Sequence, residues 1–228
     1  MEIEPSKLEI IRRRIDAARS RGPHAAPQVT LVAVTKGFGT AALEAGYGAG
    51  LRIFGESRVQ EAARKLPAFG GRKTSEVRLI GHLQSNKVKT ALELFDLIES
   101  VDSVKLLRRI QRLAGEAGRV LPVYLQVNAG HDPAKHGLDP AEVPGLLPEL
   151  QSLQHVQVTG VMTIAPLTSD EARLRDCFAS ARQIRDELRQ ALPACADLSM
   201  GMSGDYELAI EEGATHIRLG TALFGPRP

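Results

Sequence analysis

LVAVTKGFG, residues 31–39, joins an apolar run to a lysine and a glycine. The apolar residues at 31–34 leave no polar face, which is typical of a parallel strand covered by helices on one side and packed on the other. In α/β folds the reactive groups lie where parallel strands end. The amine of Lys36 therefore stands where a functional group is expected, and the rest of the chain shows whether the same pattern recurs.

Short β-branched runs alternate with helical patterns along the whole chain. The predicted strands lie at 29–35, 51–54, 77–80, 95–100, 121–128, 156–164, 196–200 and 215–219. The predicted helices between them lie at 40–48, 57–66, 84–93, 103–117, 140–151, 169–191 and 204–212. Eight such units predict an α/β fold, a (β/α)8 TIM barrel with residues 1–228 in a single domain.

The outer ring of this barrel needs one more helix. Only nine residues follow the last predicted strand, too few for a full eighth helix. We expect the helix predicted near 5–20 to complete the ring. Leu8, Ile11 and Ile15 recur at helical spacing there, so the basic run 12–14 is interpreted as its solvated face.

Composition excludes several classes of protein. The chain of 228 residues is 43% hydrophobic and has a net charge of +2, without the basic stripe of a nucleic-acid or membrane partner. No apolar run is long enough to span a membrane, and the N-terminus lacks the order of a signal peptide. We expect a cytoplasmic monomer. Cys177 and Cys195 are predicted to be reduced structural thiols, and no metal site is predicted.

The ends of the seventh and eighth strands predict an anion site. GMSGD, 201–205, places a hydroxyl and a glycine before a helix, where backbone N–H groups are free. LGT, 219–221, offers the same residue types on the neighbouring loop, where many barrels bind phosphate. Ser203, Gly220 and Thr221 are the candidate ligands. The alternative is that Ser203 only caps its helix.

Lys36 adds a reactive amine to the predicted anion site. Burial in a barrel mouth lowers the pKa of a lysine, and a neutral amine can form a Schiff base with an aldehyde. The alternatives are a side chain that reaches solvent or pairs with Glu56. An aldehyde that also carries a phosphate would satisfy both halves of the site, which points to pyridoxal 5′-phosphate (PLP).

Arg218 refines this interpretation. Strand alternation directs it to the same side as Gly220, and a guanidinium is always protonated. Beside the pyridine nitrogen it would donate a hydrogen bond and make the ring a weak electron sink. The alternative is a buried ion pair. His82 could face the cofactor or serve as an ordinary hydrogen-bonding residue, and His131 and His136 show no metal-ligand spacing that we can interpret.

At these residues the sequence resembles the pyridoxal phosphate homeostasis protein family, the YggS/PROSC type. The resemblance runs nearly end to end, through LVAVTKG, FGESRVQE, LIGHLQSNK, IESVDS, LQVN followed by KHG, GVMTIAP, and LSMGMSGDYELAIEEGATHIRLGTALFG. It implies a monomeric barrel similar to the N-terminal domain of alanine racemase, a Schiff base on Lys36, and intracellular PLP buffering or delivery.

The resemblance also implies roles for individual residues. Ser203, Gly220 and Thr221 would bind the phosphate, and Arg218 would face the ring nitrogen. Met200, His82 and Ser57 complete the predicted cofactor-binding set. Ser57 stands where many members have Asn, and Thr35-Lys36-Gly37 stands where Ser-Lys-Thr is usual, which puts contacts near the ring in doubt but leaves the lysine in place.

Three functions remain open at the level of sequence. The chain could be a carrier that passes PLP to apo-enzymes, a PLP-dependent amino-acid racemase, or an aldolase that uses Lys36 on a sugar phosphate. A racemase needs bases on both faces of the substrate, and only Lys36 is identifiable. The sequence therefore favours a carrier with no predicted catalytic residues.

Overall fold

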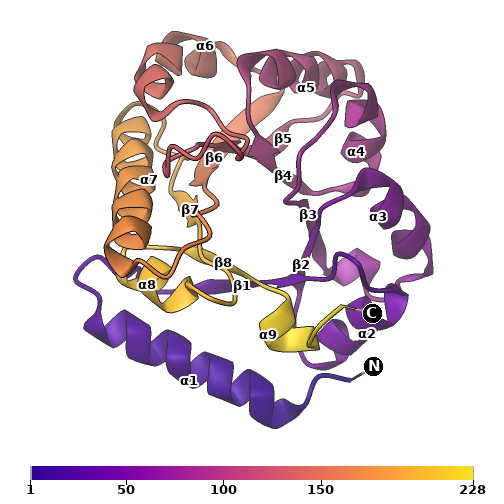
Figure 1. The fold of residues 1–228 in the computed structure, drawn as a ribbon. Helices are drawn as coiled ribbons and strands as arrows, with labels where there is room; N and C mark the ends of the chain where they lie inside the picture. The colour runs from indigo at the N-terminus through magenta and orange to yellow at the C-terminus, as the bar shows by residue number, and fades with distance from the viewer. Residues whose placement is uncertain (1, 228) are drawn as a thin grey trace.

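In the computed structural model, which describes residues 2–227, eight parallel strands close into a barrel surrounded by helices (Figure 1). Each strand pairs with its neighbours in sequence, and β1 pairs with β8 to close the ring. The strands are β1 Thr30–Val34, β2 Ile53–Glu56, β3 Glu76–Leu79, β4 Leu97–Val101, β5 Leu121–Gln126, β6 Val156–Met162, β7 Asp197–Ser199 and β8 His216–Leu219. The predicted (β/α)8 TIM barrel is confirmed.

The helices follow the predicted alternation. They are α1 Pro5–Arg21, α2 Thr40–Gly48, α3 Val59–Lys65, α4 Val88–Leu94, α5 Val104–Glu116, α6 Leu147–Ser152, α7 Glu171–Ala191, α8 Tyr206–Glu211 and α9 Thr221–Phe224. Four short 3-10 segments accompany them, η1 Leu66–Ala68, η2 Arg72–Thr74, η3 Ser85–Lys87 and η4 Pro140–Leu146.

Two predicted helices, 84–93 and 140–151, each begin with a 3-10 segment that precedes a short α-helix. Residues 140–151 were expected to form a single helix, but the structure has the 3-10 segment η4 followed by the short helix α6. Pro144 lies inside η4 and a second proline, Pro148, lies in the first turn of α6. Because proline has no N–H to donate, a continuous α-helix cannot form across them.

The N-terminal helix completes the outer ring, as predicted. The last helix, α9, has four residues, and α1 lies outside β1 and β8 and packs against α8 (Figure 1). Leu8, Ile11 and Ile15 are buried on its inner face, while residues 12–14 are exposed. The amphipathic pattern of this segment therefore holds it against the barrel.

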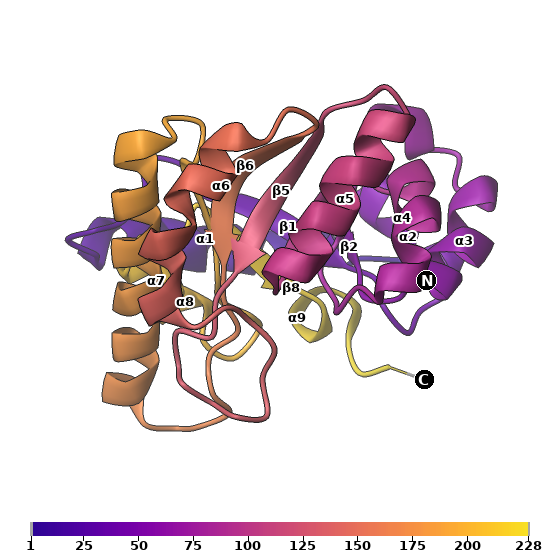
Figure 2. The ribbon, with the colours of Figure 1, turned by 90° about the horizontal axis from the view of Figure 1, so that it is seen from above.

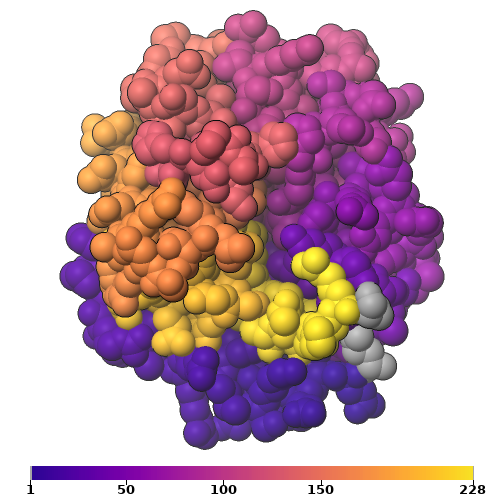
Figure 3. Space-filling view, in the orientation of Figure 1, coloured from indigo at the N-terminus to yellow at the C-terminus, as the bar shows by residue number. Residues whose placement is uncertain are grey.

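The loops that follow the strands project from one side of the molecule (Figure 2). The segments after β5 and β6 and the C-terminal residues crowd around the barrel opening there (Figure 3). Cys177 and Cys195 are buried and unpaired, in agreement with the sequence prediction. Among residues 2–227 no helix is both long and apolar enough to cross a membrane.

Candidate functional site

A cavity of about 220 Å³ opens at the carboxyl ends of the strands. Five of the eight predicted cofactor-binding residues lie in its wall. Its lining comprises Val34, Lys36, Ile80, Ile164, Met202, Ser203, Gly204, Arg218, Gly220, Thr221 and Arg227. Hollows of about 450 and 790 Å³ lie against α1, away from the carboxyl ends of the strands, so volume alone does not locate the site.

Lys36 follows β1 and reaches this cavity as a half-buried side chain. Among residues 2–227 its Nζ has neither a hydrogen-bond acceptor within reach nor an ion-pair partner. Burial lowers the pKa of Lys36, and the positive charges of Arg227 and Arg218 lower it further. A larger fraction of this amine is therefore neutral near pH 7 than for an exposed lysine, and a neutral amine is a nucleophile.

The alternative pairing of Lys36 with Glu56 does not form. The Glu56 carboxylate is fully buried, and its Oε1 lies 2.6 Å from Nζ of Lys65 on α3. Nζ of Lys65 also donates to the carbonyl oxygens of Thr35 (2.9 Å) and Phe38 (3.0 Å). Lys65 thus forms the ion pair with Glu56 and holds the backbone on both sides of Lys36 by hydrogen bonds. The Lys36 amine is left without this partner.

The loops after β7 and β8 line the same cavity, and several of their backbone N–H groups are without acceptors among residues 2–227. Within residues 2–227 no group accepts a hydrogen bond from the N–H of Ser203, Gly204, Gly220 or Thr221. The Ser203 hydroxyl joins the two loops, because its Oγ accepts a hydrogen bond from the N–H of Ala222 at 3.2 Å. Four donors without acceptors on adjacent loops fit an anion such as a phosphate group.

The expected alternative for Ser203, a cap on the helix that follows it, is wrong. The N-cap residue of α8 is Asp205, whose Oδ1 accepts a hydrogen bond from the N–H of Met202 at 2.6 Å. Ser203 instead contacts the first turn of α9. The reason is the tight loop after β7, in which Gly201 has a φ of +89° and packs against α8.

Arg218 lies inside the barrel beneath the cavity. It is buried, and its two terminal nitrogens donate to Oγ of Ser199 at 2.8 Å and to the carbonyl of Thr163 at 2.7 Å. Burial lowers the pKa of Arg218, while the charge of Glu99 acts in the opposite direction. Two hydrogen bonds thus fix the guanidinium in the wall of the cavity, and the direct ion pair considered as its alternative is absent from the described residues.

With this geometry in view, the comparisons with known proteins decide the family. A model of the alanine racemase N-terminal domain family matches residues 7–228. A pyridoxal phosphate homeostasis protein of Synechocystis is 41% identical over 202 residues, 88% of this chain and 93% of its own length. The chain belongs to the pyridoxal phosphate homeostasis protein family. The resemblance inferred from the motifs is therefore confirmed.

Solved structures agree with the family assignment. PipY of Synechococcus elongatus, without PLP, is 47% identical and superposes with a TM-score of 0.83 over 93% of this chain and 99% of that one. PipY with PLP bound is 46% identical with a TM-score of 0.82 and the same coverage. Alanine racemase of Clostridium difficile is 15% identical with a TM-score of 0.77, covering 100% of this chain and 58% of its own, and shares the fold alone.

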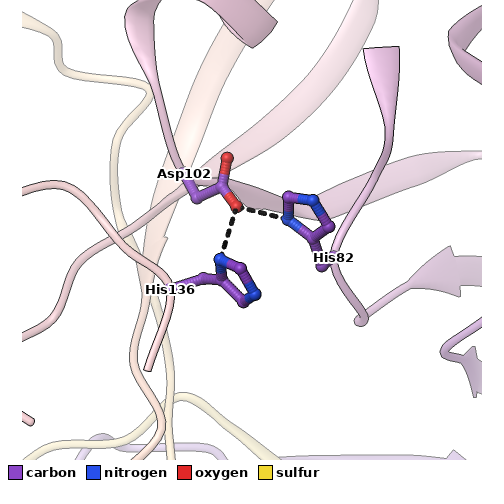
Figure 4. Close-up of side chains that lie close together, drawn as sticks. All are labelled: His82, Asp102 and His136. Atoms are coloured by element: carbon purple, nitrogen blue, oxygen red, sulfur yellow. Dashed lines mark hydrogen bonds and ion pairs between the residues drawn. The ribbon is translucent and has the colours of Figure 1, made fainter. Parts of the chain in front are cut away.

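The other three predicted site residues lie outside the cavity lining. Met200 is fully buried in the core, where its N–H donates to the carbonyl of His216 at 3.1 Å. The hydroxyl of Ser57 is buried and has no partner within residues 2–227. His82 points its Nδ1 at the carboxylate of Asp102, 2.7 Å away (Figure 4). A role for these three in binding the cofactor stays a prediction.

The barrel of this family member encloses a polar network below Arg218. Oγ of Ser199 donates to Oε2 of Glu99 at 2.6 Å, and Oε1 of Glu99 pairs with Arg78 at 3.1 Å. Arg78 in turn contacts the hydroxyl of Tyr124 and Nε2 of His216. Glu99 thus lies between the two buried guanidinium groups and compensates their charge. No spacing in the sequence indicated this network.

Sequence reasoning also missed Arg227, which lines the cavity from the C-terminal segment. Its side chain packs beside Gly37, where an added Cβ would lie 2.8 Å from Cδ of Arg227.

The polar residues after β5 have a structural role: the Asn128 amide donates to the carbonyl of Asp132 and its oxygen accepts from the Asp132 N–H. Asn128 therefore closes its own loop.

Proposed function

We propose that this chain binds PLP in the strand-end cavity and acts in PLP homeostasis, holding the cofactor through a Schiff base on Lys36 and releasing it to amines or to apo-enzymes. The observation that carries the proposal is that one cavity is lined by an unpaired, half-buried lysine and by the four unpaired N–H groups of the β7 and β8 loops. The PLP-bound structure of PipY and the names of the curated relatives support it.

The residues that line the cavity match the functional groups of PLP. PLP supplies a reactive aldehyde and an anionic phosphate on one small ring. Ser203, Gly204, Gly220 and Thr221 would bind the phosphate through N–H donors that lack any other acceptor in the described chain. Arg218, fixed by Ser199 and Thr163, would donate a hydrogen bond to the ring nitrogen. An arginine there keeps that nitrogen unprotonated, which disfavours carbanion chemistry.

The composition of the wall favours a carrier over a racemase. Among the described lining residues, the ionisable side chains are Lys36, Arg218 and Arg227. Racemisation removes a proton on one face and returns it on the other, and arginines are too basic to share that task with Lys36. The curated relatives are likewise named for homeostasis and not for an enzymatic activity.

Borohydride trapping tests the proposal directly. The holoprotein should absorb visible light, lose that absorbance on reduction, and yield one labelled peptide containing Lys36. A label on another lysine, or a colourless protein that traps a sugar phosphate instead, would overturn it in favour of a different site or of an aldolase.

Delivery is tested separately from binding. Holoprotein is mixed with several apo-enzymes, with free PLP at equal concentration as control, and recovery of activity is followed. Incubation with L- and D-amino acids in deuterated water measures α-proton exchange, and rapid exchange would show a racemase. Fractionation of cells and light scattering test the predicted cytoplasmic location and monomeric state.

A further inference from the structure

Three potential metal ligands meet at the rim of the barrel, outside the cavity described above. His82 follows β3, Asp102 follows β4, and His136 lies in the loop after β5 (Figure 4). Nδ1 of His82 lies 2.7 Å from Oδ2 of Asp102, and Nδ1 of His136 lies 3.9 Å from the same oxygen. All three ligand atoms lie within 4.8 Å of one another.

A hydrogen bond between His82 and Asp102 explains the positions of these two side chains but not the position of His136. The distance from Nδ1 of His136 to the carboxylate is too long for a hydrogen bond. The two imidazole rings nevertheless stack at a centroid distance of 4.2 Å and an interplanar angle of 14°. Both rings therefore turn the same nitrogen toward one carboxylate oxygen, although they come from different loops.

Small side-chain rotations would convert this arrangement into a coordination site. In a tetrahedral zinc site with bonds of about 2.0–2.2 Å, ligand atoms lie roughly 3.3 Å apart. The nitrogen of His82 must retreat from the carboxylate by about half an ångström and that of His136 must approach by a similar amount, with the rings tilting so that their lone pairs converge. The side chains are 43% and 63% exposed, so both can turn without disturbing the core.

The ligand types indicate the class of ion. Two imidazole nitrogens and one carboxylate oxygen suit Zn²⁺ and its transition-metal neighbours, whereas Ca²⁺ and Mg²⁺ prefer shells made of oxygen. Asp102 is nearly buried, with an 8% exposed side chain, and anchors the group. The exposed rings leave a fourth position open to water.

We propose that His82, Asp102 and His136 bind a divalent transition-metal ion of the zinc class. An ion there would join the loops after β3, β4 and β5 and so fasten the segment 129–137 to the barrel rim. None of the three side chains lines the cavity of Lys36. A test of the metal site therefore does not depend on whether the proposed PLP-binding function is correct.

Calorimetry with ZnCl₂ on the full-length, PLP-free protein tests the proposal. PLP is left out because it chelates metals itself. We expect one equivalent of Zn²⁺ to bind and MgCl₂ to give no signal. His136→Ala, His82→Ala and Asp102→Asn should each weaken binding by at least about tenfold, since loss of even an outer-shell partner typically has that effect. His136 is exposed, so its replacement should leave the fold intact.

His24→Ala is the matched control, because His24 is exposed and lies in the loop after α1. It should bind Zn²⁺ like the parent protein. Co²⁺ adds a spectroscopic readout, with the intense visible bands of a tetrahedral site expected in the parent and absent in His136→Ala. The proposal is overturned if the three variants bind Zn²⁺ as the parent does, if His24→Ala weakens binding equally, or if Mg²⁺ competes.

Discussion

At the scale of single residues, Lys36 and Lys65 show how two lysines a short distance apart in space acquire different properties. Lys65 is almost fully buried but surrounded by acceptors, among them Glu56 and two backbone carbonyls. Lys36 is less buried yet has no acceptor within residues 2–227, and burial, followed by the charges of nearby arginines, lowers its pKa. The partners of an amine, more than its depth, decide whether it is structural or reactive.

Replacing Lys36 by Ala should weaken PLP binding without abolishing it. The phosphate-binding N–H groups of the β7 and β8 loops are unaffected, so PLP should bind noncovalently. We expect a loss of at least about tenfold, since one charge-assisted contact already contributes about 1.5–3 kcal/mol. Equilibrium dialysis measures this loss, with Lys89→Ala, a change at an exposed position of α4, as control. Retention of PLP equal to that of the parent would contradict the assignment.

The reactivity of Lys36 should depend on pH in a shifted range. Because the pKa of Lys36 is lowered, labelling by an amine-reactive aldehyde should reach its half-maximal rate at a lower pH than labelling of the lysine in a short unstructured peptide. Arg227→Ala removes one of the positive charges and should move the Lys36 midpoint back upward. Peptide mapping by mass spectrometry measures both profiles. A Lys36 midpoint equal to that of the peptide lysine would refute the prediction.

At the scale of elements, the loop after β7 shows glycines with opposite functions. An added Cβ at Gly201 would lie 2.6 Å from Cβ of Ala209, and its φ of +89° disfavours other residues. An added Cβ at Gly204 would meet no atom within 4 Å, although Gly204 lines the cavity. Gly201 therefore shapes the loop, whereas Gly204 keeps space and a backbone donor available for a ligand.

Substitutions at these two glycines should separate stability from binding. Gly201→Ala should lower the free energy of unfolding by about 1–3 kcal/mol, the scale of a strained backbone conformation. Gly204→Val should leave that free energy nearly unchanged but weaken PLP binding by blocking the donors. Urea unfolding and dialysis measure the two effects, with Gly145→Ala, another open position, as control. Normal PLP binding by Gly204→Val would contradict the phosphate assignment.

At the scale of the whole molecule, the barrel interior is polar where it approaches the cavity. Arg78 on β3 and Arg218 on β8 share Glu99, directly or through Ser199. A buried charge without a partner is strongly unfavourable. The network therefore ties the orientation of Arg218 to the closure of the complete barrel.

His216 makes stability depend on pH. Burial and the charges of Arg78 and Arg218 lower the pKa of His216 to about 3 from its usual 6.5, and Asp197 is 3.9 Å away. The unfolded chain takes up a proton below about pH 6.5 that the folded chain does not bind, so stability should fall as pH drops from about 6.5 toward 3. The folded state is favoured by His216 staying neutral.

Urea unfolding between about pH 7 and pH 5 measures this dependence. His216→Asn should be less stable at pH 7 but should lose less stability on acidification than the parent protein. His24→Ala should retain the parental slope, because His24 is exposed. An unchanged slope in His216→Asn would show that other groups cause the acid sensitivity.

The order of strands and helices, the barrel and the family all follow from patterns in the amino-acid sequence. Apolar runs such as 31–34 and the helical spacing of Leu8, Ile11 and Ile15 are local patterns, and their periods reflect the geometry of a strand or helix. Motifs at strand ends also indicated Lys36, Ser203, Arg218, Gly220 and Thr221, because closing a parallel barrel brings all strand ends to one mouth.

The partners of these residues, in contrast, become known from the three-dimensional fold alone. Lys65 pairs with Glu56 in place of Lys36, Ser203 contacts α9 instead of capping α8, and His136 after β5 stacks on His82 after β3. Such contacts join residues far apart in the chain, and their distances follow from barrel closure and loop packing rather than from sequence spacing. Local patterns set what each segment becomes, whereas three-dimensional proximity sets the charge, burial and chemistry of each side chain.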